Sequence, residues 1–176
     1  GAADAAAGQG AHPAARSPYH LVVARLVPYK QIDLAIEAFN RLGRRLVIVG
    51  DGRDRARLTA LAGPTITFTG RLPDAEVKQL LAGCEALVWP GVEDYGLVPV
   101  EAMAAGRPVI ARREGGVLDT VVDGVTGVFF GPPTADALAA AVRTADSIAW
   151  QPAAIRAQAA RFDGATFEVR LAAAVG

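Results

Sequence analysis

The feature that most constrains the fold of this 176-residue chain is a regular alternation of short apolar runs with segments of helical spacing. An apolar run at 21–24 is followed by a helical pattern from Ile32 to Leu42, and a second run at 46–49 by another helical pattern. These runs are apolar throughout, which is typical of strands buried on both faces. The alternation therefore predicts a parallel sheet covered by helices on both sides.

The whole pattern predicts six strands, at 21–24, 46–49, 65–69, 86–89, 108–111 and 127–130. Between them, Asp74 is expected to cap one helix, and a short helix is expected from Pro99 to Ala105 with Gly106 ending it. With the common strand order 3-2-1-4-5-6, the predicted fold class is a Rossmann-like three-layer α/β/α domain.

Composition excludes several classes of partner. Eighteen basic residues balance eighteen acidic ones, so no general attraction to nucleic acid is expected and any anion site must be local. The single cysteine, Cys84, excludes an internal disulfide and suits a reducing compartment, and two separated histidines do not favour a zinc site. No apolar run approaches the ~20 residues of a membrane span.

Residues 1–18 form an Ala- and Gly-rich lead-in without the basic start and apolar block of a signal peptide. This stretch is predicted to be a flexible linker or cloning remnant. Residues 19–176 are then expected to form one domain.

The densest unusual chemistry follows the first and fourth expected strands, which lie side by side in the predicted order. Ligands bind at the carboxyl ends of strands at such a reversal. After the first strand, Arg25 and Lys30 stand beside an expected helix start, an arrangement suited to a phosphate or diphosphate. A pair of solvated surface charges is an equally good interpretation of these two residues alone.

After the fourth strand, Glu93 and Glu101 flank a segment in which Gly96 permits close backbone approach to a ligand. The amides of Leu97 and Val98 precede a helix and attract an anion. The two carboxylates suit hydroxyl groups, so the loop fits a phosphate with diols on both sides, as in a nucleoside diphosphate sugar. Alternatively, Glu101 only complements the helix dipole and Glu93 is a surface residue.

Two further turns are candidates for ligand contact. Gly50 and Gly52 resemble part of a dinucleotide fingerprint but lack its third glycine, so they are expected to form a tight turn beneath a nucleotide. Arg71 and Leu72 follow the third strand and either flank the base or form a plain connecting turn.

From Tyr19 to Val175 the chain resembles the C-terminal, donor-binding domain of family-four retaining glycosyltransferases with the GT-B fold. Four segments carry the resemblance, and the last is the family's motif of two glutamates separated by seven residues. The segments cover 24–30, 49–52, 69–72 and 93–101.

The resemblance implies catalytic roles for three residues. Arg25 and Lys30 would bind the donor diphosphate and stabilise it as the leaving group, and Glu93 would hold hydroxyls of the donor sugar. No metal or other cofactor is implied. The glycine pair Gly115–Gly116 would lie near the same crevice.

The resemblance implies donor-binding roles for the other candidates. Gly96, Leu97 and Val98 would supply backbone amides, and Glu101 would accept hydrogen bonds from the ribose diol. Arg71 and Leu72 would line the base pocket, while Gly50 and Gly52 would lie beneath the nucleotide.

Two departures from the family pattern stand out. Many members carry glycine directly after the lysine, whereas this chain has Gln31, which puts a close backbone approach there in doubt. The chain is too short to include the acceptor-binding N-terminal half, so the isolated domain is predicted to be inactive. Any membrane contact would come through that half, and the full-length enzyme is expected in the cytoplasm, with peripheral contact to the inner face of the membrane as one arrangement.

The implied function is retaining transfer of a hexose from a nucleoside diphosphate sugar to an unknown acceptor. The base stays open between UDP, GDP and ADP, with similarity to bacterial mannosyltransferases favouring GDP-mannose. The alternatives are a non-catalytic nucleotide-binding or receiver-like module and a GT-B-like epimerase or phosphorylase half. A nicotinamide dehydrogenase is disfavoured by the incomplete glycine fingerprint.

Overall fold

The computed structural model describes residues 12–94 and 96–162. Its centre is a six-stranded sheet in the order β3-β2-β1-β4-β5-β6, which confirms the predicted topology. Every neighbouring pair is parallel. The strands are β1 (His20–Val23), β2 (Leu46–Val49), β3 (Ile66–Gly70), β4 (Leu87–Trp89), β5 (Val109–Arg112) and β6 (Gly127–Phe130).

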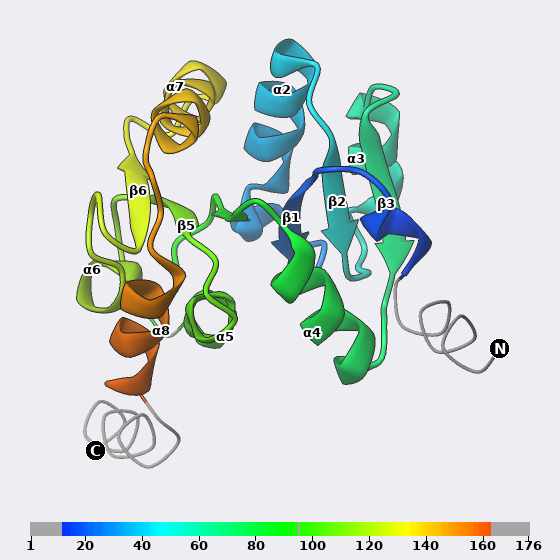
Figure 1. Ribbon diagram of the computed structural model, residues 1–176. Coiled ribbons are helices and arrows are strands. Elements are labelled where there is room, and N and C mark those ends of the chain that lie inside the picture. Colours follow the sequence, from blue (N-terminus) through cyan, green and yellow to red (C-terminus); the bar gives the residue numbers. More distant parts are fainter. Residues whose placement is uncertain (1–11, 95, 163–176) are drawn as a thin grey trace, which may run out of the picture.

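Helices cover both faces of the sheet and give the predicted three-layer arrangement (Figure 1). One face carries α2 (Ile32–Leu42), α3 (Arg55–Leu61) and α7 (Ala135–Asp146), and the other carries α4 (Asp74–Gly83), α5 (Leu97–Ala104), α6 (Val117–Thr120) and α8 (Pro152–Ala160). Successive strand residues pack against opposite helical layers. In β2, Ile48 packs with the first set of helices and Val47 with the second, and both side chains are fully buried. This two-sided burial is why the strands lack a polar alternation.

The boundaries of two helices differ from the sequence prediction. Helix α5 begins at Leu97, so Pro99 is its third residue, a position where a first-turn proline removes no helical hydrogen bond. Asp74 is the first residue of α4 and makes no capping hydrogen bond, because Pro73 occupies the cap position. Gly106 follows α5 with φ of 78° and donates to the Met103 carbonyl at 2.9 Å, which confirms its role in ending the helix.

Part of the expected lead-in packs against the domain. Pro13–Ala15 form a 3-10 helix, labelled η1, and Ala14 is 5% exposed. Arg45 Nη1 donates to Ser17 Oγ at 2.7 Å. Residues 12–18 therefore contact the folded core. Residues 1–11 lie outside the described residues, and so do residues 165–175, whose spacing in the sequence also predicts a helix.

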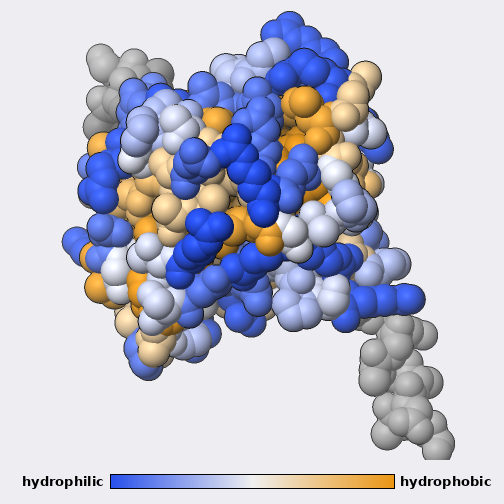
Figure 2. All heavy atoms as spheres, turned by 90° about the horizontal axis from the view of Figure 1, so that it is seen from above, coloured by the Kyte–Doolittle hydropathy of each residue, from blue (hydrophilic) through white to orange (hydrophobic). Residues whose placement is uncertain are grey.

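Seen from the side of α2 and α7, the surface mixes hydrophilic and hydrophobic residues (Figure 2). Ion pairs cross this layer between Arg41 and Asp136 and between Arg44 and Asp146. In the described part of the chain, no helix is both long and apolar enough to cross a membrane.

Candidate functional site

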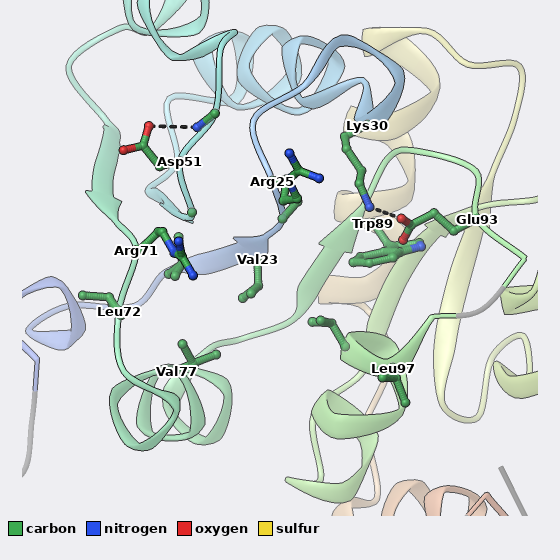
Figure 3. Close-up of a pocket in the computed structure, with 15 residues that line it drawn as sticks. Val23, Arg25, Lys30, Asp51, Arg71, Leu72, Val77, Trp89, Glu93 and Leu97 are labelled. Atoms are coloured by element: carbon green, nitrogen blue, oxygen red, sulfur yellow. Dashed lines mark hydrogen bonds and ion pairs between the residues drawn. The ribbon is translucent and has the colours of Figure 1, made fainter. Parts of the chain in front are cut away.

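A crevice of about 920 Å³ opens at the carboxyl ends of β1 to β4 (Figure 3). Most predicted site residues line it, and two of the strands that end there, β1 and β4, are neighbours at the reversal of strand order. The predicted residues among its lining are Arg25, Lys30, Gly50, Gly52, Arg71, Leu72, Glu93, Leu97 and Val98. Gly96 and Glu101 are not among the lining residues.

The loops after β1 and β2 pack backbone against backbone. A side chain at Gly50 would place its Cβ 1.8 Å from the Ala24 carbonyl oxygen, and one at Gly52 would place it 2.4 Å from that of Leu26. The Leu26 N–H also donates to the Asp51 carbonyl at 3.0 Å. These contacts hold the Arg25 loop against the β2 loop, so the two glycines shape the floor of the crevice as well as lining it.

Lys30 and Glu93 form an ion pair across the crevice. Lys30 ends the 3-10 helix η2 (Pro28–Lys30) after β1, and Glu93 lies in the loop after β4. Both side chains are largely buried, at 13% and 20% exposed. Burial, and then the charge of nearby Arg25, lower the pKa of Lys30, so the ammonium depends on its carboxylate partner.

Two aromatic rings accompany the Lys30 ammonium. Its Nζ lies 5.2 Å from the centroid of the Tyr29 ring and 5.7 Å from that of Trp89. Trp89 is the last residue of β4 and is buried, whereas Tyr29 is 60% exposed. The ammonium is thus held by one carboxylate and by aromatic faces.

The loop after β5 supports the backbone of the Glu93 loop. The Gly116 N–H donates to the Glu93 carbonyl oxygen at 2.8 Å. A Cβ at Gly115 would lie 2.7 Å from the same oxygen, and one at Gly116 would lie 2.2 Å from the Asp94 oxygen. The glycine pair therefore lies near the crevice, as predicted, and there it allows two loops to touch.

The N-terminus of α5 faces the crevice through Leu97 and Val98. Because the helix begins at Leu97, the amides of both residues belong to its first turn, where N–H groups have no partner within the helix. Gly96 occupies the cap position with φ of −109°, and a Cβ there would lie 3.0 Å from the Pro99 ring. The geometry favours an anion at this helix end.

Glu101 lies one turn further along α5 and faces α4. Its side chain is exposed overall, but burial of the carboxyl raises its pKa, with Lys78 opposing the rise and Asp74 adding to it. Glu101 therefore lies near α4 and outside the crevice lining, four residues after Leu97 and on the same face of α5.

The far end of the crevice is formed by Arg71 and Leu72 after β3, with Val77 of α4 (Figure 3). Leu72 and Val77 are partly buried, and together with Val23 they give this end an apolar wall. An apolar wall beside a guanidinium suits a planar, partly polar group such as a base.

Gln31 follows Lys30 in the left-handed conformation, with φ of 52° and ψ of 39°. Among the described residues it is the only non-glycine with positive φ. Its Oε1 accepts a hydrogen bond from Arg112 Nη1 at 2.9 Å. Glycine adopts this conformation without steric cost, whereas the glutamine here gains a side-chain hydrogen bond.

Asp51 and Trp89 are the polar and the aromatic residue among the crevice-lining residues that sequence reasoning did not identify. Asp51 stands between the two predicted glycines, where it accepts from the Gly52 N–H at 2.8 Å, and Trp89 ends a predicted strand. Within 12–94 and 96–162, no three His, Cys, Asp or Glu side chains form a group that could hold a metal ion. The expectation of a metal-free site stays a prediction.

Curated relatives are glycosyltransferases. The chain is 39% identical over 155 residues to the glycogen synthase of Mycobacterium tuberculosis, covering 80% of this chain and 36% of that enzyme. It is 41% identical over 107 residues to a GDP-mannose-dependent alpha-mannosyltransferase of the same species, covering 60% of this chain and 28% of that enzyme. The chain thus spans about a third of the length of these relatives.

Solved structures share the fold. HepE of Anabaena in complex with UDP-glucose superposes with a TM-score of 0.76 at 26% identity, covering 92% of this chain and 49% of HepE. The sucrose-phosphate synthase of Thermosynechococcus elongatus gives a TM-score of 0.69 at 32% identity, covering 82% of this chain and 39% of that chain.

The family model for glycosyl transferases group 1 matches residues 10–160, which is most of the chain and includes every candidate site residue. This assignment confirms the resemblance stated from the sequence and removes the receiver-like and dehydrogenase alternatives. The chain therefore belongs to the glycosyl transferases group 1 family, as a domain with the GT-B fold.

Proposed function

We propose that this chain is the donor-binding domain of a retaining glycosyltransferase that transfers a hexose from a nucleoside diphosphate sugar. The observation that carries the proposal is the meeting of Arg25, Lys30 and Glu93 in one crevice at the reversal of strand order. Two cations beside a helix N-terminus suit a diphosphate, and an adjacent carboxylate suits sugar hydroxyls. HepE, which shares the fold, is solved with UDP-glucose.

In the proposed complex the diphosphate lies between the two cations and the first turn of α5. Arg25 and Lys30 would carry the negative charge that grows on the diphosphate as the sugar departs, and the amides of Leu97 and Val98 would add to this stabilisation. The Lys30–Glu93 ion pair satisfies two poorly hydrated charges. Donor binding would replace this ion pair by two new contacts, one between Lys30 and a phosphate and one between Glu93 and the sugar hydroxyls.

The remaining candidates would hold the nucleoside. Glu101 would accept hydrogen bonds from the ribose diol, and Arg71 with Leu72 would hold the base against the apolar wall. Gly50 and Gly52 would place the tight turn after β2 beneath the nucleotide, where their missing side chains leave room for the Arg25 loop, and Gly96 would contribute its backbone at the start of α5.

The proposed reaction retains the configuration at the anomeric carbon by attack of the acceptor on the face from which the diphosphate leaves. Positioning and the two cations would supply most of the rate enhancement, so the proposal includes no divalent metal. The acceptor would be held by a part of the enzyme outside this chain, and the isolated chain would bind donor without turning it over.

Titration calorimetry with UDP, GDP, ADP and the matching monophosphates tests the proposal. A diphosphate should bind more tightly than its monophosphate, because only the diphosphate reaches both cations, and the base with the highest affinity identifies the donor. Addition of EDTA should leave that affinity unchanged. Equal affinity for the diphosphate and the monophosphate of every base would refute the proposed site.

A further inference from the structure

Among the described residues, Trp89 is the one large aromatic side chain buried at the crevice floor, where it lies beneath the Lys30–Glu93 pair (Figure 3). Its ring centroid is 5.7 Å from Lys30 Nζ, and only 6% of the residue is exposed. The indole can therefore interact with the ammonium in a site from which much of the water is already excluded.

If the donor binds as proposed, the diphosphate replaces Glu93 as the anionic partner of Lys30, and a further contact is needed to hold the ammonium in place during this exchange. In the structure Glu93 neutralises the ammonium. When sugar hydroxyls engage Glu93, that carboxylate turns towards the sugar, while burial and the charge of Arg25 continue to disfavour the ammonium. A carboxylate that stayed on Lys30 would also repel the incoming diphosphate, so a group that holds the ammonium alongside the phosphate must attract a cation without carrying negative charge.

We propose that Trp89 is the positioning residue for Lys30, holding its ammonium in the crevice by cation–π contact while the donor separates Lys30 from Glu93. The inference rests on the proposed function and deepens it. The indole face is neutral overall but attracts a cation, and of the aromatic side chains it does so most strongly. Trp89 thus steadies Lys30 without competing for it against phosphate.

Tyr29 is the other ring near Lys30 Nζ, at 5.2 Å, and it provides an internal comparison. It is 60% exposed, so water competes for the ammonium on that side. Loss of an exposed cation–π contact should reduce affinity about two- to fivefold, and loss of a desolvated one about ten- to thirtyfold.

The test is the ratio of diphosphate to monophosphate affinity for one base, measured by calorimetry on this chain. Destabilisation of the fold lowers the apparent affinities for the diphosphate and the monophosphate by the same factor. A misplaced Lys30 lowers only the affinity for the diphosphate. Trp89→Leu should reduce the ratio about ten- to thirtyfold, Trp89→Phe less, and Tyr29→Leu about two- to fivefold. In a Lys30→Met background, Trp89→Leu should leave the ratio unchanged, because the ammonium is already gone.

A second measurement does not require mutation of Trp89. The chain has two tryptophans, so a Trp150→Phe variant leaves Trp89 as the only indole reporter. Its emission should change when a nucleoside diphosphate binds and stay constant with the monophosphate, because only the diphosphate moves the ammonium above the ring.

The outcomes separate the inference from the function on which it rests. If the wild type prefers the diphosphate but Trp89→Leu and Trp89→Phe keep the wild-type ratio, Trp89 is only a packing residue and the inference is overturned. The inference is likewise overturned if Trp89→Leu lowers the ratio equally with and without Lys30. If the wild type itself does not prefer the diphosphate, the proposed function fails, and this inference fails with it.

Discussion

Gly116 donates its backbone N–H to the carbonyl oxygen of Glu93 at 2.8 Å. The loop after β5 thus restrains the backbone from which the Glu93 carboxylate, in the loop after β4, extends. Gly115, which precedes it, has φ of 82°, and a Cβ there would meet the same carbonyl oxygen. The glycine pair thus acts on the proposed sugar-binding carboxylate through the backbone, without reaching the crevice.

A matched pair of glycine variants tests this contact. Gly115 and Gly124 have nearly the same φ, 82° and 80°, but a Cβ at Gly124 meets nothing within 4 Å. Alanine at either position should cost about 1–2 kcal/mol of unfolding free energy from the left-handed backbone. Only Gly115→Ala should also reduce affinity for the nucleoside diphosphate sugar, and an equal reduction in Gly124→Ala would contradict the proposed support of Glu93.

The Glu93→Gln variant should have opposite effects on stability and on nucleotide binding. Without the carboxylate, the buried Lys30 ammonium loses its ion partner, so the empty domain should be destabilised by about 1–3 kcal/mol. The same change frees Lys30 for phosphate, so the diphosphate should bind about 1 kcal/mol more tightly, while the added affinity from the sugar falls. Denaturation curves and calorimetry measure the two effects. Weaker diphosphate binding in this variant would show that the ion pair does not compete with the donor.

The Glu101→Ala variant should weaken nucleotide binding by about 1.5–3 kcal/mol, the usual contribution of hydrogen bonds to a charged group. The loss should be the same for the diphosphate and the monophosphate, because both carry the ribose, and it should disappear for ligands that lack the ribose hydroxyls. Glu76→Ala serves as a control, since Glu76 lies in the first turn of α4 outside the crevice lining. Unchanged affinity in Glu101→Ala would remove Glu101 from the donor site.

Much of the fold was predictable because each strand packs hydrophobic side chains against helices on both faces of the sheet. Val47 and Ile48 are neighbours in sequence and face opposite sides, so the run is apolar at every position and indicates a buried parallel strand. The strand order followed from the common topology of such sheets and was confirmed. The order in turn predicted that the Arg25 and Glu93 loops would meet.

The parts that the sequence did not predict depend on tertiary geometry. Helix α5 begins two residues before Pro99. The sequence did not reveal this start, because the cap residue Gly96 has no side chain that could mark it. In the sequence, nothing distinguishes Trp89 from the other apolar residues of the predicted strands. Its contact with Lys30 depends on the face of β4 that it occupies and on the position of η2, and both are set by the tertiary fold. The left-handed Gln31 carries no sequence signal, since glutamine is not typical of that conformation.

Gln31 offers a test of how the chain tolerates this backbone strain. Gln31→Ala removes the hydrogen bond to Arg112 and keeps the left-handed φ, whereas Gln31→Gly removes the bond and relieves the strain. After allowance for the greater freedom of unfolded glycine, the glycine variant should be about 1 kcal/mol more stable than the alanine variant. Urea denaturation compares them, and an alanine variant at least as stable as the glycine variant would show that position 31 is unstrained.

The buried His20 should set the acid limit of the fold. His20 is 2% exposed, its ring centroid lies 5.0 Å from that of Phe39, and its Nδ1 is 3.3 Å from Glu85 Oε2. Burial, and then the charge of Arg44, lower the pKa of His20 to about 4, with Asp146 acting in the opposite direction. The folded state therefore favours neutral His20, whereas the unfolded chain binds a proton near the ordinary pKa of about 6.5.

Because the folded pKa is the lower of the two, the stability from neutral His20 is complete above about pH 6.5 and is lost as pH falls towards about 4. The shift corresponds to a loss on the order of 3 kcal/mol across that window. Urea denaturation at a series of pH values should show this slope in the wild type, and His20→Gln should flatten it although the variant is less stable at neutral pH. A slope that persists unchanged in His20→Gln would assign the acid sensitivity to other groups.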